Sequence, residues 1–151
     1  MSVVEVLTSL RVPHVLHTHP PIRGEADLHL TALDWTTSVK TLAFVLPDDR
    51  LVLVGVPGPA KLAYGAVARA LGVPRSALRP APEARLAALG MEPGGVSPIC
   101  ADPAVTVLFD GAVPAMGRLY CGGGTPELTV ELDSSDLVHI AAGALVAGIT
   151  T

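Results

Sequence analysis

The chain has 151 residues, half of them hydrophobic, and a formal net charge of −4 at pH 7. This length allows one domain with a buried core and leaves too little chain for two. No segment has the ~20 uninterrupted apolar residues that a membrane span requires. The first five residues already include Glu5 and lack the positive start of a signal peptide. We therefore expect a single domain over residues 1–151, in the cytoplasm.

Lysine is scarce, since Lys40 and Lys61 are the only two. This scarcity argues against a protein that grips a long run of nucleic-acid backbone by charge. It does not exclude a protein that holds only the end of an RNA. Cys100 and Cys121 have no CxxC spacing, so we expect two reduced thiols rather than a disulfide or a zinc ribbon.

The N-terminal part predicts a capped helix followed by a short strand. Ser2 and Glu5 form a capping box, so a helix should begin there and run to about Arg11. Residues 15–19 are typical of a brief strand, and residues 25–33 favour a helix.

Two apolar runs, residues 41–46 and 51–56, flank a turn signal and predict a β-hairpin. Because both runs are almost continuously hydrophobic, we expect both faces of the hairpin to be covered by helices. Residues 61–71 predict a helix that ends at Gly72, a natural C′ residue.

The second half mixes short strands and helices. The expected helices are residues 82–89 and 136–142, a loop covers 90–103, and the expected strands are residues 105–109, 119–121, 128–132 and 145–149. Since no regular βαβ repeat is present, the fold class should be α+β rather than doubly wound.

The loop from Gly90 to Pro98 is rich in glycine and proline. Besides its two ends it contains Pro93, Gly94 and Gly95. Proline fixes φ and glycine admits positive φ, so the loop is shaped and has little side-chain bulk. Bare backbone lets a ligand approach and presents N–H groups to an oxygen. An ordinary long turn is the alternative.

A second glycine cluster, Gly122, Gly123 and Gly124, separates two expected strands. By itself it favours a hairpin loop. The pattern is neither GxGxxG nor a Walker loop, so it does not predict a nucleotide phosphate site.

A few polar residues are weak candidates for chemistry. His17 and His19 would share one face of a strand and could hold a metal, but no third ligand has convincing spacing, so surface histidines are the favoured interpretation. Ser97 could be a nucleophile, yet it lacks the Gly-x-Ser-x-Gly elbow. Asp110 could be a general base, an orienting acceptor or a turn former.

Taken in order, these segments resemble the YbaK/prolyl-tRNA-synthetase-associated editing family. The resemblance covers nearly the whole chain, and Lys40 and the Gly-Pro loop are its most specific parts. The segments that carry it are residues 39–42, 57–58, 90–98, 110, 122–124 and 135–144.

The resemblance implies a mixed, curved β-sheet flanked by helices, with a cleft for the 3′ end of an aminoacyl-tRNA. Family members release wrong amino acids such as alanine or cysteine from tRNAs, most often proline tRNA. They act inside a prolyl-tRNA synthetase or as free-standing proteins, and this chain would act in trans. A synthetase or elongation factor is a conceivable further partner.

Carried over by position, the resemblance implies two groups of site residues. The catalytic group would be Lys40, Gly94, Gly95 and Asp110. The substrate-binding group would be Gly90, Val96, Ser97, Pro98, Gly122, Gly123 and Gly124. No metal and no cofactor is expected.

The chain departs from the family pattern at three places: residues 23–26, Leu62 with Ala63, and Thr129, where some members carry a histidine. These departures leave the preferred amino acid open.

Three functional hypotheses follow. The first is a hydrolase of mischarged tRNA that uses backbone donors and no covalent intermediate. The second is a non-catalytic module that binds aminoacyl-tRNA or a synthetase. The third is a small esterase with Ser97 as its nucleophile.

Overall fold

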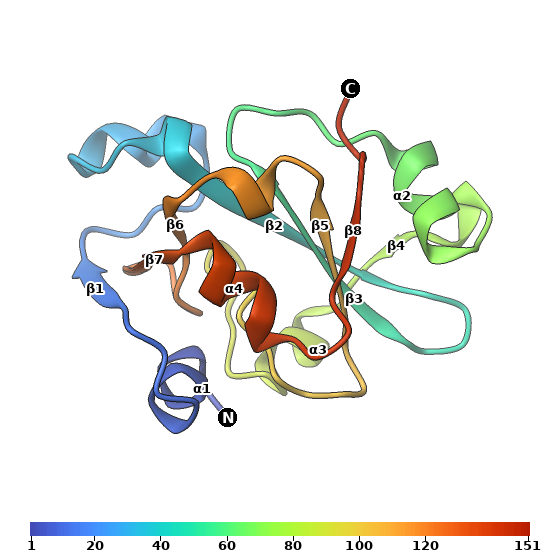
Figure 1. Ribbon diagram of the computed structural model, residues 1–151, viewed down its shortest axis with the longest axis horizontal. Coiled ribbons are helices and arrows are strands. Elements are labelled where there is room, and N and C mark those ends of the chain that lie inside the picture. Colours follow the sequence, from blue (N-terminus) through green and yellow to red (C-terminus); the bar gives the residue numbers. More distant parts are fainter.

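The computed structural model describes residues 1–151, which form one mixed β-sheet with helices packed on it (Figure 1). The α-helices are α1 (Val3–Ser9), α2 (Tyr64–Leu71), α3 (Glu83–Ala87) and α4 (Ser134–Ile140), and the 3₁₀ helices are η1 (Glu25–Leu30), η2 (Trp35–Thr37), η3 (Arg75–Ala77) and η4 (Val113–Ala115). The strands are β1 (Val15–Thr18), β2 (Ser38–Val45), β3 (Leu51–Pro57), β4 (Arg79–Pro80), β5 (Thr106–Asp110), β6 (Arg118–Gly122), β7 (Leu128–Asp133) and β8 (Leu145–Ala147). None of the helices is both long and apolar enough to cross a membrane.

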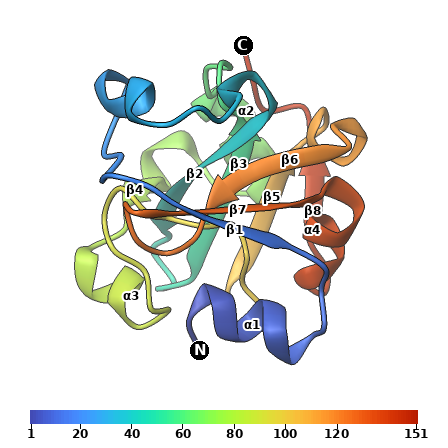
Figure 2. The same ribbon diagram turned by 90° about the vertical axis from the view of Figure 1, so that its left-hand side faces the viewer.

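The strand order is β1-β7-β6-β2-β3-β5-β8, and β4 pairs with β2 beside this path (Figure 2). The pairs β1/β7, β6/β7, β2/β3 and β2/β4 are antiparallel. The pairs β2/β6, β3/β5 and β5/β8 are parallel. This mixed sheet with flanking helices confirms the predicted α+β fold class.

Two hydrophobic cores cover the two faces of the central strand β3. Leu53 belongs to the larger core, which includes residues of α1, α3 and α4. Val52 and Val54 belong to the smaller core, together with Val67 and Leu71 of α2. Because successive side chains of a strand point to opposite faces, the continuous apolar run of β3 serves both cores.

The predicted start of α1 and the predicted end of α2, each marked by a local sequence signal, are confirmed. Ser2 and Glu5 form the expected capping box at α1, and Gly72 closes α2 in the left-handed conformation with φ +69°. The segment predicted as a helix over residues 25–33 is instead the 3₁₀ helix η1. It begins after Gly24 without a side-chain cap and buries none of its residues, so packing does not extend it.

The predicted hairpin is present as β2 and β3, but β2 is not covered on both faces as expected. Lys40 is exposed, and the three residues after it, Thr41 to Ala43, are only partly buried. The outer edge of β2, away from β3, pairs with β6 at Ser38 and Val39 and with β4 at Phe44 and Val45. Between these two pairings the edge has no partner strand.

Asp110 ends β5 and attaches the C-terminal segment to the sheet. Its carboxylate accepts hydrogen bonds from the N–H groups of Ala112 and Ile149, each at 3.0 Å. The residue is only 5% exposed. A buried carboxylate that satisfies two main-chain donors is a structural element of this sheet edge.

Asp110→Asn should therefore lower the free energy of unfolding by about 1–3 kcal/mol, because the amide group can accept only one of the two hydrogen bonds. Urea denaturation followed by circular dichroism measures the change. Asp102→Asn is the matched control, since Asp102 accepts one N–H, from Ala104, in an exposed turn. Equal stability of the two variants would contradict the assigned role of Asp110.

Candidate functional site

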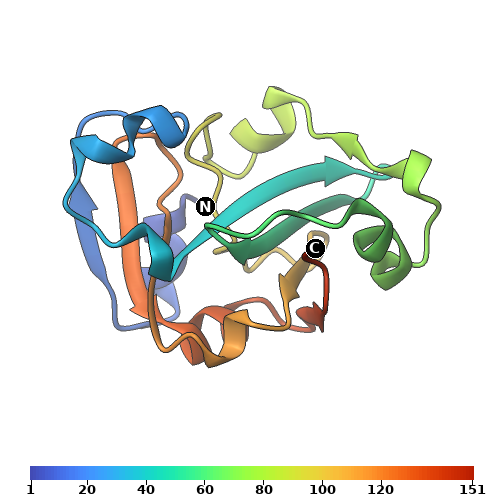
Figure 3. The same ribbon diagram turned by 90° about the horizontal axis from the view of Figure 1, so that it is seen from above.

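A cavity of about 520 Å³ opens beside the unpaired edge of β2. Lys40 and Thr41 form its β2 wall, η1 and η2 contribute residues such as Leu28 and Trp35, and residue 129 of β7 lies opposite. Figure 3 shows the blue η1–η2 segment running from beside β1 and β7 to the start of β2.

The two glycine loops are joined by main-chain hydrogen bonds at this cavity. The Glu92 N–H donates to the Gly124 carbonyl oxygen (2.7 Å), and the Gly124 N–H donates to the Gly95 carbonyl oxygen (2.9 Å). A Cβ atom on Gly95 would lie 2.5 Å from main-chain atoms of Thr125. A Cβ on Gly122 would collide with the Val96 carbonyl oxygen. Only glycine permits this approach of the two loops.

Four of the predicted site residues come together here: Lys40, Gly94, Val96 and Gly122 all line the cavity. The Lys40 side chain is exposed and makes no hydrogen bond or ion pair within the chain, so its ammonium group is available to a ligand. Gly94 has φ +83° and packs against Arg23, which also lines the cavity.

Some residues that line the cavity have unpaired main-chain donors. The N–H groups of Gly94 and Val96 make no hydrogen bond to the main chain. In β2, the Ala43 carbonyl oxygen accepts from the Ala81 N–H across the outer edge. Strand residues two apart direct their peptide groups to the same edge, so the Thr41 N–H points into the gap between β6 and β4. Such donors can bind a carbonyl oxygen or stabilise an oxyanion.

The Thr41 side chain supports a polar ligand at this position. Its Oγ1 atom is buried and has no hydrogen-bond partner. Leaving a buried hydroxyl unsatisfied costs about 1–3 kcal/mol. A bound group that supplies the missing partner would recover this free energy.

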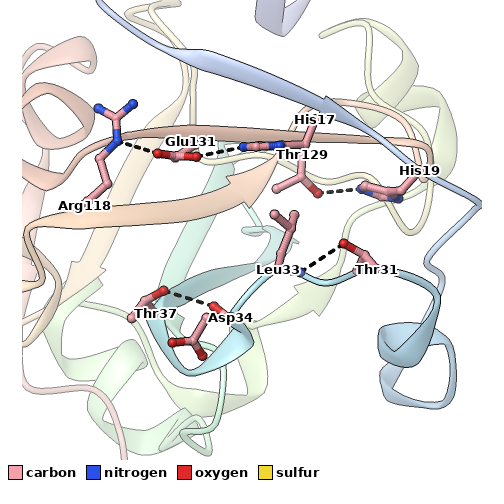
Figure 4. Close-up of polar contacts among 9 residues, drawn as sticks. All are labelled: His17, His19, Thr31, Leu33, Asp34, Thr37, Arg118, Thr129 and Glu131. Carbon is pink, nitrogen blue, oxygen red and sulfur yellow. Dashed lines mark hydrogen bonds and ion pairs between the residues drawn. The ribbon is translucent and has the colours of Figure 1, made fainter.

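His19 and Thr129 form a polar contact in the cavity wall that the sequence alone did not identify. The His19 ring makes two hydrogen bonds, one from Nδ1 to the Pro20 carbonyl oxygen (2.8 Å) and one between Nε2 and Thr129 Oγ1 (2.7 Å) (Figure 4). The antiparallel β1/β7 register brings the two residues together, although they are far apart in sequence.

His17 lies on β1, but the strand ends at Thr18, just before His19, and the two rings have separate partners. His17 Nε2 lies 2.8 Å from Glu131 Oε1, and Arg118 Nε donates to Glu131 Oε2 at 2.8 Å (Figure 4). The Arg118 guanidinium, and then His17, lower the pKa of the Glu131 carboxyl group. The two histidines therefore do not converge on one point where they could share a metal ion.

Trp35 is a second cavity residue that the sequence did not single out. Its indole Nε1–H donates to the Leu28 carbonyl oxygen at 3.4 Å, which links η2 to η1. It is the one tryptophan of a chain with only 3% aromatic residues, and that scarcity was the available signal.

The other predicted site residues lie behind the cavity or away from it. Gly95, Gly123 and Gly124 belong to the joined loops, Gly90 has φ +72° and packs on Ser2, and Pro98 is buried. Asp110 does not line the cavity, and both carboxylate oxygens are used by main-chain donors. The structure therefore gives Asp110 a structural role in place of the catalytic role that the resemblance implied.

Ser97 is fully buried, and its hydroxyl accepts the Ile99 N–H at 3.1 Å. It is not positioned to attack a ligand in the cavity, which argues against the esterase hypothesis. Cys100 and Cys121 are free and buried, as expected, and burial raises the pKa of the Cys121 thiol to about 12. Burial also raises the pKa of the Cys100 thiol, and neither cysteine lines the cavity.

The cavity thus combines a free ammonium group with unpaired main-chain N–H groups of residues that line it. The chain belongs to the aminoacyl-tRNA editing domain family, whose model matches residues 19–140.

Two solved structures share the whole fold. Hypothetical protein APE2540 has 25% sequence identity and a TM-score of 0.80, with 99% of each chain covered. A "putative trans-editing enzyme for prolyl tRNA synthetase" has 25% identity and a TM-score of 0.78, with 99% of this chain and 95% of that chain covered.

A curated relative links the chain to a synthetase. A proline–tRNA ligase of Desulfitobacterium hafniense is 38% identical over 80 residues. This alignment covers 53% of the chain but only 14% of the ligase. The chain thus corresponds to a small part of that relative.

Gly95→Ala tests the contact between the two glycine loops. We expect a loss of about 1–3 kcal/mol of unfolding free energy, because the added methyl group meets the Thr125 main chain. Gly65→Ala is the control. Gly65 lies in α2, where a Cβ would only touch the end of the Arg69 side chain at 3.6 Å, so helix propensity should stabilise that variant by about 0.5–1 kcal/mol. Equal stabilisation of both variants in thermal denaturation would show that the loops do not pack as described.

Proposed function

We propose that the chain hydrolyses, in trans, the ester bond of a mischarged tRNA. The substrate is the tRNA for proline carrying alanine, cysteine or another small amino acid. The observation that carries this proposal is the meeting of the free Lys40 ammonium group with unpaired main-chain donors in one cavity. Membership of the editing family and the similarity to a proline–tRNA ligase support the choice of substrate.

The cavity suits the end of an aminoacyl-tRNA in size and composition. Its volume lies within the range of about 300–1,000 Å³ that is usual for small-molecule sites. Trp35 offers an aromatic surface for a base, and base–aromatic stacking contributes about 1–3 kcal/mol. Lys40 is available to contact the terminal nucleotide.

The reaction needs little help from side chains, because an aminoacyl ester is already activated. A water molecule adds to the ester carbonyl carbon, and the negative charge develops on the carbonyl oxygen. Main-chain N–H groups such as those of Thr41, Gly94 and Val96 are the candidate donors to this oxygen. One donor of this kind is worth about 3 kcal/mol of transition-state stabilisation. The bond to the ribose oxygen then breaks, and that oxygen takes the proton that the attacking water gives up, which yields the free amino acid and the tRNA hydroxyl.

Selection of the amino acid would be largely steric. One wall of the cavity is formed by Gly94, Gly122 and the side chain of Val96. This wall is fixed in place, because the main chains of the two loops behind it are in direct contact. A wall of this kind excludes a larger residue more readily than a smaller one, and one methylene group changes binding by about 1–3 kcal/mol.

The charge distribution favours contact with the RNA end alone. Lys40 and Arg23 are the only lysine or arginine residues in the cavity wall, and the chain carries a net charge of −4. With so few cations, a synthetase or an elongation factor that holds the tRNA body would supply the remaining affinity.

Lys40→Ala should lower the deacylation rate of alanyl-tRNA for proline by about 10- to 100-fold, the effect expected for losing a charged hydrogen bond. Release of radiolabelled alanine measures it. Lys61→Ala is the matched control, because Lys61 is the other lysine and is exposed outside the cavity. Circular dichroism should show both variants folded.

Unchanged rates for Lys40→Ala on proline tRNAs charged with alanine, cysteine, serine and threonine would refute the role of Lys40. Binding of these tRNAs by the wild type without any release of amino acid would instead support the non-catalytic module.

A further inference from the structure

The His19–Thr129 pair remains without a role in the reaction as described above. Both residues line the cavity, and Thr129 is only 4% exposed. Thr129 lies on β7, and His19 directly follows β1, where its N–H donates to the Glu127 carbonyl oxygen at 3.0 Å. A polar pair held by two paired strands at a cavity wall has the geometry of a recognition element.

The hydrogen bonds of His19 determine which of its two ring nitrogens carries the proton. The Pro20 carbonyl oxygen can only accept, so the Nδ1 atom 2.8 Å from it must carry hydrogen. In the neutral ring Nε2 is then an acceptor. The Thr129 hydroxyl, 2.7 Å away, must therefore donate its proton to Nε2.

In this arrangement the proton of the Thr129 hydroxyl is already used, so only the lone pairs of Oγ1 remain available. A hydroxyl that has given its proton to one partner can serve further ligands solely as an acceptor. The cavity thus presents donors on the β2 side, namely the Lys40 ammonium and the Thr41 N–H, and an oriented acceptor on the β7 side.

We propose that Thr129 Oγ1, oriented by His19, accepts a hydrogen bond from the α-ammonium group of the bound aminoacyl ester. This inference rests on the proposed function, because it concerns the amino acid carried by the tRNA. The ester has its carbonyl oxygen and its ammonium group on neighbouring carbons. The donors on the β2 side match the carbonyl oxygen of the ester, and the acceptor on the β7 side matches its ammonium group. Thr129 and His19 are accordingly positioning residues for the amino acid.

Glu25 is the alternative partner for the ammonium group, since it supplies the one carboxylate in the cavity wall. It lies on η1, is exposed and makes no hydrogen bond. Water screens an exposed carboxylate, whereas the Thr129 oxygen is buried and held in one orientation. The structure therefore favours Thr129.

The test uses two stable amide analogues of the tRNA end, 3′-alanylamino-3′-deoxyadenosine and 3′-propionylamino-3′-deoxyadenosine. They differ only by the α-amino group. Calorimetry gives the dissociation constant of each for the wild type, Thr129→Val, Thr129→Ser and His19→Phe. Thr36→Val is the matched control in the same cavity, because the Thr36 hydroxyl also donates its proton, to Asp34 at 2.6 Å, but Thr36 is exposed, so water screens its oxygen.

The wild type should bind the alanyl analogue about 10-fold or more tighter than the propionyl analogue, as expected for a hydrogen bond to a charged group. Thr129→Val should abolish this preference and leave propionyl binding unchanged. Thr129→Ser should retain it, His19→Phe should reduce it, and Thr36→Val should not alter the ratio. A role in folding alone would weaken both analogues equally.

Three outcomes overturn the inference. The preference could survive Thr129→Val, it could be lost in Glu25→Gln instead, or the wild type could bind both analogues equally. Failure of the proposed function is a separate result, in which the wild type binds neither analogue and releases no amino acid from charged proline tRNAs.

Discussion

The main-chain contact between the loops at residues 90–98 and 122–126 is the constraint on which the cavity depends. Gly95 lies against the Thr125 main chain, and Gly122 lies against the Val96 carbonyl oxygen, so no side chain can separate the loops. Two hydrogen bonds between residues 92, 95 and 124 hold them together. The rigid wall that results positions Gly94 and Val96 and sets the size of the space beside them. Glycine here serves close packing of backbone, and its benefit to a ligand is indirect.

The second constraint is the interruption in pairing along β2. A complete sheet would bury every peptide group of this strand in ladder hydrogen bonds. Instead β6 pairs at one end of the outer edge and β4 at the other. The free stretch between them supplies an N–H donor and an unsatisfied threonine hydroxyl at position 41. An unpaired edge is normally a liability. Here it lies in the wall of a cavity, where its N–H group is available to a ligand.

These two constraints leave the cavity with only a few groups that can take part in a reaction. The cavity has a free ammonium group, main-chain donors and one oriented acceptor, while Ser97, Cys100 and Cys121 are buried outside its lining. Such a site suits an activated ester, whose hydrolysis needs orientation and charge stabilisation more than a strong nucleophile. Under the proposed function, an acidic chain can act on the end of an RNA, because only the terminal nucleotide has to be held.

Local sequence signals determined most of the elements of this protein. The capping box at Ser2 and Glu5, the left-handed Gly72 and the apolar runs of the hairpin depend on neighbours in the chain, and each element forms where expected. Family motifs also placed Lys40 and the glycine loops at one site. Tertiary structure alone decided the rest. The segment after Gly24 became a 3₁₀ helix because nothing buries it, and Asp110 became a main-chain anchor because the C-terminal segment passes beside β5. The pairing of His19 with Thr129 arises from the register of two strands more than 100 residues apart, which no local pattern encodes.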